Sequence, residues 1–313
     1  MIERQLGRLM VGASKVIQTS PNGLAVAYDG LRPILPGHAI VAPARPVARL
    51  CDLTADELDS LFCTVRSLQS LIGPKHGATA FNLAVHDGAA AGQPTLLPHV
   101  HVRCRLEHLL AALLTRHAWS RWRRQVHVVP RQPGDLAPDA IYNALDRWSP
   151  EGLETVPPPF HVPSDEERHA RTAEQMAAEA DSYAAAAAGF DFQQEARPTS
   201  PIHFAKIELA ASQIFFARRL TVAVVNLKPL CPGHVLVIPR RSVPTMAELD
   251  DDEHADLWAT VRQVQAIVEA CHGASASKLG VQDGKAAGQS VPHVHVHILP
   301  QPPQPATAGS SGA

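Results

Sequence analysis

The chain lacks a long apolar run and a strong net charge, and each absence excludes a class of protein. No segment of the 313 residues reaches the roughly 18 consecutive apolar residues of a membrane-spanning helix. The formal net charge of −2 disfavours attachment to nucleic acid or to an anionic membrane through bulk charge. A small anionic substrate needs only local donors. We therefore expect a globular protein with neither nucleic-acid nor membrane partners.

Cysteine is scarce and scattered along the chain. The cysteines form no Cys-x-x-Cys pair, and no apolar leader stands at the amino terminus. An odd, scattered set in such a chain is typical of free thiols in a reducing compartment. We expect a cytoplasmic protein, and the nucleus is also compatible. The five cysteines are Cys51, Cys63, Cys104, Cys231 and Cys271.

The dominant feature of the sequence is an internal repeat with a spacing of 196 residues. Pro36-Gly-His38 returns as Pro232-Gly-His234, and Ala90-Ala-Gly-Gln93 returns as Ala286-Ala-Gly-Gln289. The spacing holds without a gap from position 36 to position 93. Such long self-similarity predicts two copies of one domain, as the chain length also suggests.

Both copies show the same order of elements. An apolar run (24–28 or 220–225) and a Pro-rich turn precede a second strand. A helix follows, introduced by the capping signature Thr54-Ala-Asp-Glu57 or by Asp250 with Glu253. A strand (278–281 in copy two), a Gly-rich loop and a His-rich strand complete the unit. This order predicts an α+β fold with an antiparallel sheet, duplicated in tandem. We expect domains at 14–150 and 199–302, a linker at 151–198 and a disordered tail at 303–313.

The linker differs from both copies. It begins with Pro157-Pro-Pro159, and Ser164-Asp-Glu-Glu167 is predicted to cap an Ala-rich helix that runs to about Gly189. We interpret this segment as a docking helix without chemistry.

Three histidines alternate with valine at the end of copy two. Side chains alternate between the two faces of a strand, so His293, His295 and His297 should share one face and line a cleft. Three interpretations compete. The imidazoles could be buried structural groups, zinc ligands of the His-x-His type, or a nucleophile with its orienting and proton-donating neighbours. The metal interpretation is weakened because no acidic or cysteine ligand lies nearby in the sequence.

The loop before the histidines favours nucleophilic catalysis. It is rich in glycine and in amide and hydroxyl donors, and backbone N–H groups of such loops form concave anion sites. An imidazole beside an anion site suits phosphoryl or nucleotidyl transfer, which depends chiefly on positioning and on donors aimed at phosphoryl oxygens. The candidate substrate-binding residues are Gln282, Gly288, Gln289, Ser290 and Val291.

The pattern His-φ-His-φ-His-φ-φ from His293 to Leu299 resembles the signature of the histidine triad (HIT) superfamily. The Gln282-Asp-Gly run, the Ala-Gly-Gln289 run and Val225-Asn226-x-Lys-Pro229 resemble its Fhit branch, the dinucleoside triphosphate hydrolases. The resemblance covers about 100 residues of each copy. It implies hydrolysis of diadenosine triphosphate-like substrates to a nucleoside mono- and diphosphate through a covalent nucleotidyl-histidine.

The resemblance also assigns roles to individual residues. His295 would attack the α-phosphorus, His297 would contact phosphate oxygens or assist the leaving group, and His293 would orient the set with His234. Asn226 would bind a ribose hydroxyl, although it could be only a turn residue, and His234 could be only structural. A substrate-contacting histidine of the family near the first strand has no counterpart in the stretch from Phe204 to Leu209. The family implies no tightly bound cofactor or protein metal site, and Mg²⁺ or Mn²⁺ would accompany the polyphosphate.

Copy one departs from the pattern at the histidines. His99 and His101 are followed by Arg103 rather than by a third histidine. His127 would complete the triad if residues 103–126 were absent, and this basic stretch is either a real insertion or a translated intron in a gene model. His86 replaces the loop glutamine, and Gly30 stands at the place of the ribose-binding asparagine. We expect copy one, including His38, to be degenerate or interrupted and catalytically poor.

Two further alternatives stay open from the sequence. Adenylyl-sulfate or nucleoside phosphoramidate hydrolysis would use the same intermediate, and a nucleotide-binding signalling module would turn over slowly. Because domains of this family pair through their sheets, we expect an intramolecular pseudo-dimer, with a homodimer of full chains as the alternative.

Overall fold

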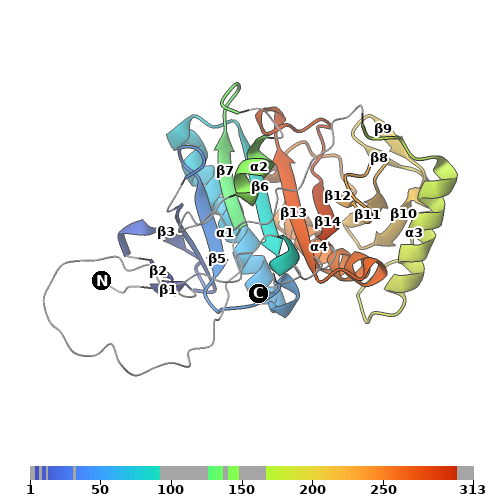
Figure 1. Ribbon diagram of the computed structural model, residues 1–313, viewed down its shortest axis with the longest axis horizontal. Coiled ribbons are helices and arrows are strands. Elements are labelled where there is room, and N and C mark those ends of the chain that lie inside the picture. The colour runs from blue at the N-terminus through green and yellow to red at the C-terminus, as the bar shows by residue number, and fades with distance from the viewer. Residues whose placement is uncertain are drawn as a thin grey trace, which may run out of the picture.

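The two copies share one continuous sheet. The structure is a computed structural model, and it describes residues 4–6, 9–11, 13–30, 33–91, 126–136, 140–147 and 167–301. Ten strands pair in the order β10-β11-β12-β14-β13-β6-β7-β5-β4-β3, and every neighbouring pair is antiparallel (Figure 1). Each copy contributes five consecutive strands, so the expected pseudo-dimer lies within one chain.

The elements follow the repeat. Copy one contains β3 (Val16–Thr19), β4 (Ala25–Asp29), β5 (Ala39–Pro43), α1 (Ala55–His76), β6 (Ala80–Asp87) and β7 (Val126–Arg131). Copy two contains β10 (Ile214–Ala217), β11 (Thr221–Val225), β12 (Val235–Pro239), α4 (Asp251–His272), β13 (Ala276–Asp283) and β14 (Val296–Gln301). The shorter elements are β1 (Arg4–Leu6), β2 (Leu9–Val11), α2 (Ala140–Asp146), α3 (Ala173–Ala187), β8 (Ile202–Phe204) and β9 (Ile207–Leu209).

Both long helices begin where the sequence predicts. Thr54 and Asp250 each accept a hydrogen bond from the backbone three residues on, and Glu57 and Glu253 bond back to the capping residue. Both helices end at a glycine in the left-handed conformation, Gly77 and Gly273. The helices pack on one face of the sheet (Figure 1), where their apolar stripes join Leu83, Val296 and neighbouring strand residues in one buried cluster.

The pseudo-twofold axis passes through the β6–β13 seam. Ala84 pairs with Gly280, and these two residues occupy equivalent positions of the repeat. On the helical face, Phe62 stacks on Trp258, its repeat equivalent, with ring centroids 3.5 Å apart and planes within 5°. An aromatic pair of this size buries a large apolar area. The seam is therefore a packed core rather than a loose domain contact.

Buried polar groups also cross the seam in equivalent pairs. Asp283 accepts a hydrogen bond from Gln69 Nε2 at 2.9 Å, and Asp87 accepts one from Gln265, the equivalent residue of copy two. Both aspartates also bond a backbone N–H of their own copy. Buried polar groups are nearly always hydrogen-bonded, so these contacts fix one register of the two copies.

The linker prediction is wrong about the start of its helix. Helix α3 begins at Ala173, and Thr172 is its capping residue, bonded reciprocally with Gln175. The Thr-x-x-Gln pattern at 172–175 supplies the pair of capping bonds that was expected from Ser164 to Glu167. Residues 167–172 are not helical. The expected disordered tail at 303–313 and Ser164 lie outside the described residues.

In the portion of the chain that the structure describes, no helix has the length and apolar character needed to cross a bilayer. Four cysteines within that portion are free thiols, at positions 51, 63, 231 and 271.

Candidate active site

One cavity of about 660 Å³ crosses the sheet face opposite the long helices. Its lining changes character along the strand order. The end over β11 and β12 is apolar. The middle carries His297 of β14 and the histidines that directly precede β12 and β14, and the far end reaches across β13 onto copy one. The apolar end is formed by Phe204, Ile207, Leu209, Val224, Leu227 and Leu236, and the central histidines are His234, His295 and His297.

His295 has one defined tautomer. Its Nδ1 lies 2.7 Å from the backbone oxygen of His293, and a carbonyl oxygen only accepts, so Nδ1 carries the proton. The lone pair is therefore on Nε2. His295 is a buried residue, only 4% exposed, and burial lowers its pKa, so the ring is neutral at pH 7. A neutral imidazole with a free Nε2 lone pair is the form that attacks an electrophile.

His234 sets the opposite tautomer on His297. The Nδ1 of His234 accepts the backbone N–H of Leu230 at 3.0 Å, so its proton is on Nε2, 2.9 Å from Nδ1 of His297. His297 therefore keeps its own proton on Nε2 as a donor. Burial lowers the pKa of His234 to about 3 and that of His297 well below its usual range. A neutral nucleophile thus stands beside a neutral donor, with the two rings 4.9 Å apart.

The expectation that all three imidazoles would line the cleft is wrong for His293. Strand β14 begins only at Val296, and His293 is fully buried beside the cavity. Its Nε2 donates to the oxygen of Pro239 at 3.0 Å, and its Nδ1 accepts the N–H of Ala205 at 3.1 Å. Both ring nitrogens are used structurally. His293 can act only through its backbone oxygen, which holds His295.

The valines between the histidines behave as the alternation predicts. Val294 and Val296 enter the main core beneath α4, together with Ile298. The alternating pattern therefore predicts the apolar face correctly. It does not predict the position of His293, which is buried beside the cavity rather than exposed to it.

Most of the predicted loop contacts reach the cavity. Gln282, Gly288, Ser290 and Val291 line it, whereas Gln289 does not. Gln289 instead holds the loop: its amide donates to the oxygens of Pro244 and His293, and its carbonyl oxygen accepts the N–H of Gly284. Gln289 therefore shapes the loop from behind, and its direct contact with phosphate, expected from the sequence, has no support in this geometry.

Asn226 lies at the cavity beside His234. Its side-chain oxygen accepts the N–H of Lys228 at 3.1 Å, while its amide nitrogen is 3.3 Å from Nε2 of His234. The turn role and the position in the site therefore coexist in one residue.

Sequence reasoning missed Arg168, which lies in the segment expected to lack chemistry. Arg168 lines the cavity, and its positive charge contributes to lowering the pKa values of His234 and His297. The neighbouring Arg171 donates to the backbone oxygen of Asn226 and thereby ties the linker to the site. A lone arginine between two domains carries no local signal, so only the tertiary structure places it.

The β8–β9 hairpin covers the apolar end. The hairpin lines the cavity with the apolar side chains of Phe204, Ile207 and Leu209, and with one carboxylate, that of Glu208. The stretch from Phe204 to Leu209, in which the family's first-strand histidine has no counterpart, therefore does line the site. It contributes apolar side chains instead of an imidazole.

Copy one retains the equivalent of the His234–His297 pair. His127 pairs with Ile40 and Ala84 in the sheet, and His297 pairs with their repeat equivalents, Leu236 and Gly280. His38 Nε2 lies 3.1 Å from Nδ1 of His127, and its Nδ1 accepts the N–H of Ile34. His127 thus takes the position of a third triad histidine, as the interrupted pattern predicts. His99 and His101 lie outside the described residues.

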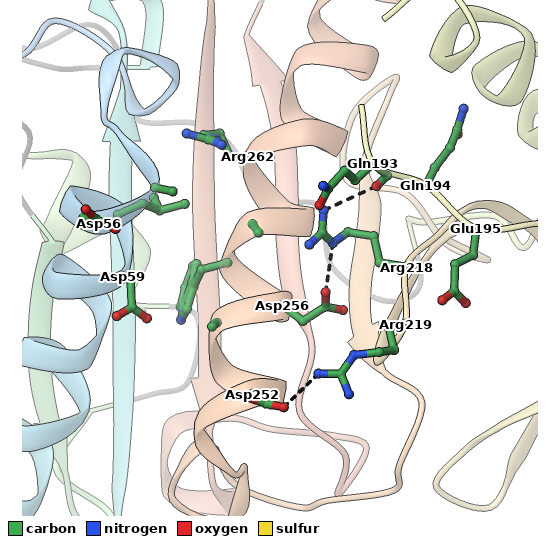
Figure 2. A pocket seen from close by; sticks show the side chains of 15 residues that line it. Asp56, Asp59, Gln193, Gln194, Glu195, Arg218, Arg219, Asp252, Asp256 and Arg262 are labelled. Carbon is green, nitrogen blue, oxygen red and sulfur yellow. Dashed lines mark hydrogen bonds and ion pairs between the residues drawn. The ribbon is translucent and has the colours of Figure 1, made fainter. Parts of the chain in front are cut away.

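A second cavity of about 710 Å³ lies on the helical side of the sheet (Figure 2). Its charged side chains largely bond one another: Arg218 pairs with Asp256, and Arg219 with Asp252. Asp59, which lines this cavity, also belongs to the one group among the described residues that could hold a metal ion, with Cys63 and His254. Because α1 and α4 carry this group, it is separated by the sheet from the histidine cavity.

Comparisons with known proteins agree with this geometry. The profile of the family described as "HIT domain" matches residues 11–108 and 208–304, which together exceed half of the chain. The chain is similar to a Schizosaccharomyces pombe protein named bis(5'-nucleosyl)-tetraphosphatase [asymmetrical], with 52% identity over 100 residues that cover 32% of this chain and 54% of that protein. It is also similar to an Arabidopsis thaliana protein named bifunctional bis(5'-adenosyl)-triphosphatase/adenylylsulfatase FHIT, with 49% identity over 98 residues, 31% of this chain and 54% of that protein.

The crystal structure of the Caenorhabditis elegans NitFhit protein matches 38% of this chain and 29% of its own with 40% identity and a TM-score of 0.34. The chain spans about half the length of the curated relatives it matches. One conclusion follows from the two matched regions, the repeated antiparallel unit and the histidine pair of each unit. This chain belongs to the HIT domain family and contains two copies of the domain in tandem.

Proposed function

We propose that this chain hydrolyses dinucleoside polyphosphates through a nucleotidyl group held covalently on His295. The observation that carries the proposal is the pair of opposite tautomers in the cavity: His295 offers an unprotonated Nε2, and His297 offers an Nε2–H. A nucleophile and a donor to the phosphoryl oxygens are the two groups that nucleotidyl transfer requires.

In the first step, Nε2 of His295 attacks the α-phosphorus and a P–N bond forms. The P–O bond to the rest of the polyphosphate breaks, and its electron pair leaves with the bridging oxygen as a nucleoside diphosphate. His297 Nε2–H donates to the phosphoryl group as charge develops on it. The positive charge that attack creates on His295 is spread over the ring and stabilised by the carbonyl oxygen of His293, which accepts a hydrogen bond from Nδ1–H.

In the second step, water attacks the phosphorus and releases a proton to the surrounding solvent, and the P–N bond breaks. The electron pair returns to Nε2 of His295, and a nucleoside monophosphate leaves. The donors of the Gly288–Val291 loop, with Gln282, would hold the phosphoryl oxygens throughout. The apolar end of the cavity would take a nucleobase, and Asn226, which lines the cavity beside His234, would bind a ribose hydroxyl. Mg²⁺ or Mn²⁺ would enter with the polyphosphate and offset its charge.

A second candidate activity uses the same intermediate. Adenylyl sulfate also carries an electrophilic α-phosphorus with a good leaving group, and the name of the Arabidopsis thaliana relative includes adenylylsulfatase. Nucleoside phosphoramidates differ again only in the leaving group. Side-by-side turnover of the three substrates ranks them, and tight binding with very slow turnover of all three would instead indicate the nucleotide-binding signalling module.

The test is the fate of the nucleotidyl group. Full-length protein is mixed with diadenosine triphosphate labelled at the α-phosphorus and quenched in alkali, where a phosphohistidine-type bond survives. We expect one label per chain at His295, and its absence together with a loss of turnover of roughly 10⁴-fold or more in His295→Ala, with retained binding. His127→Ala, which removes the copy-one equivalent of His297, is the control for loss of a copy-one histidine and should keep the label. Unchanged hydrolysis by His295→Ala would refute the proposal.

A further inference from the structure

The far end of the histidine cavity is built by both copies. Lys278 comes from β13, whereas His86 of β6 and Asp146 of α2 come from copy one, and all three line the cavity. Lys278 Nζ donates to the two carboxylate oxygens of Asp146 at 2.7 and 2.8 Å, and His86 Nε2 is 3.5 Å from Asp146 Oδ1. His86 also faces Lys278 directly across the strand pair. A cation, a carboxylate and an imidazole therefore form one cluster in the wall.

Packing of the two copies does not account for this cluster. The side chains of Lys278 and Asp146 are only 17% and 8% exposed, and a partly buried ion pair contributes little net stability because its desolvation cost offsets the attraction. The repeat has also diverged here. The equivalent of Lys278 in copy one is Asn82, which accepts a hydrogen bond from Arg131, so the cluster occurs on one side of the pseudo-twofold axis only. Its position in the cavity suggests a role toward a ligand.

The strand geometry directs the leaving group toward Lys278. His295, His297 and Leu299 follow one another at two-residue steps on the cavity side, and Leu299 of β14 pairs with Lys278 of the neighbouring strand β13. At about 3.3 Å per residue, the Lys278 level lies roughly 13 Å beyond His295. In an in-line displacement the leaving group departs on the side of the phosphorus opposite the nucleophile. With the phosphorus near His297, that side is the Lys278 end.

Small side chains line the cavity between the histidines and the cluster. Gly280 and Ala84 occupy it on β13 and β6, side by side at the seam, and both line the cavity. Larger side chains at these two positions would fill the space that a phosphate chain needs. The apolar end already fits the retained nucleoside, so the charged end is left for the other half of the substrate.

We propose that Lys278 binds the phosphates of the leaving nucleotide, and that Asp146 and His86 of copy one are positioning residues that fix its ammonium group. The inference rests on the proposed function for the direction of the reaction. It gives copy one a part in the reaction of copy two, whether or not copy one turns over. The ammonium contributes a charge-assisted hydrogen bond to a phosphate oxygen, a bond about twice as strong as a neutral one.

The test separates substrates by their leaving groups. Steady-state kcat and KM are measured for full-length wild type, Lys278→Met and Asp146→Asn on diadenosine triphosphate and on adenosine 5'-phosphoramidate, whose leaving group carries no phosphate. For Lys278→Met we expect kcat/KM to fall about 10- to 100-fold on the first substrate and less than about 2-fold on the second. Asp146→Asn should show a smaller loss with the same selectivity, and Lys278→Arg should recover most of it. The exposed Lys75→Met is the control for loss of a lysine.

A binding experiment keeps the inference independent of turnover. Calorimetry measures the affinities of the methylene-bridged diadenosine triphosphate analogue and of adenosine monophosphate. A selective loss for the analogue in Lys278→Met supports the subsite even if the wild type hydrolyses nothing, in which case the proposed function fails alone. An equal loss for both ligands, an equal loss for both substrates, or no loss at all overturns the subsite.

Discussion

Two hydrogen bonds, from Leu230 N–H to His234 and from His234 to His297, set the tautomer of His297, and we call them the tautomer relay. His234 offers the sharpest test of this relay because copy one contains a matched control. The change His234→Ala removes the Nε2–H that lies 2.9 Å from Nδ1 of His297. The acceptor is then left without its buried donor, which costs about 1–3 kcal/mol, or roughly 5- to 150-fold in an equilibrium or rate ratio. Because this donor fixes the proton of His297 on the nitrogen that faces the phosphate, we expect the loss mainly in kcat.

The control is His38→Ala, which removes the equivalent bond to His127, at 3.1 Å. Both histidines are 2% exposed, and each accepts one backbone N–H, so the two substitutions should lower the free energy of unfolding by similar amounts. The assay is kcat/KM for diadenosine triphosphate, with urea unfolding of both variants. Equal catalytic losses in the two variants, or none in either, would refute the assignment of the relay in copy two to catalysis.

Three further predictions concern pH and packing. Burial lowers the pKa values of His295 and His297, so the acid limb of kcat/KM should lie below pH 6.5, and a limb at or above 6.5 would contradict the neutral-imidazole mechanism. Phe62→Ala should lower the free energy of unfolding by about 3–5 kcal/mol, because it empties the stack on Trp258, while turnover at 25 °C persists; a cost under about 1 kcal/mol would contradict a packed seam. Acid should also destabilise the fold, because the unfolded chain protonates histidines below pH 6.5 that the folded chain keeps neutral. The free energy of unfolding should fall by up to about 1.4 kcal/mol per pH unit for each such group between pH 6.5 and its lowered pKa, and equal stability in denaturant at pH 7.5 and 5 would disprove it. Burial lowers the pKa values of His38, His86 and His254 to about 4 and that of His234 to about 3, and it also lowers those of His127 and His297 well below their usual range.

The local elements could be predicted from the sequence because their causes are local. Thr54 and Asp250 start the two long helices through bonds to the next turn, and the Val-His alternation places Val296 in the core. The register of the repeat could also be predicted, because it requires only a comparison of the chain with itself. Where a local pattern occurs twice, the sequence alone is ambiguous: the Ser164 box was expected to begin the helix that Thr172 actually begins.

The composite nature of the site could not be predicted, because its partners are far apart in the chain. Lys278 meets Asp146 across 132 residues, and Arg168 enters the cavity from a linker. His293 is buried because Ala205 and Pro239 satisfy both of its ring nitrogens, and neither contact leaves a trace in the local pattern.

By itself, the sequence determined the family, the duplication, the antiparallel α+β unit and the identity of the histidines, since each is written in short-range periodicity or in the 196-residue repeat. Only the tertiary structure decided which imidazole carries a free lone pair. It also decided that residues of copy one form part of the wall of the cavity in copy two. Proton positions and cavity walls are set by which groups approach within hydrogen-bonding distance, and the pairing of β6 with β13 brings those groups together.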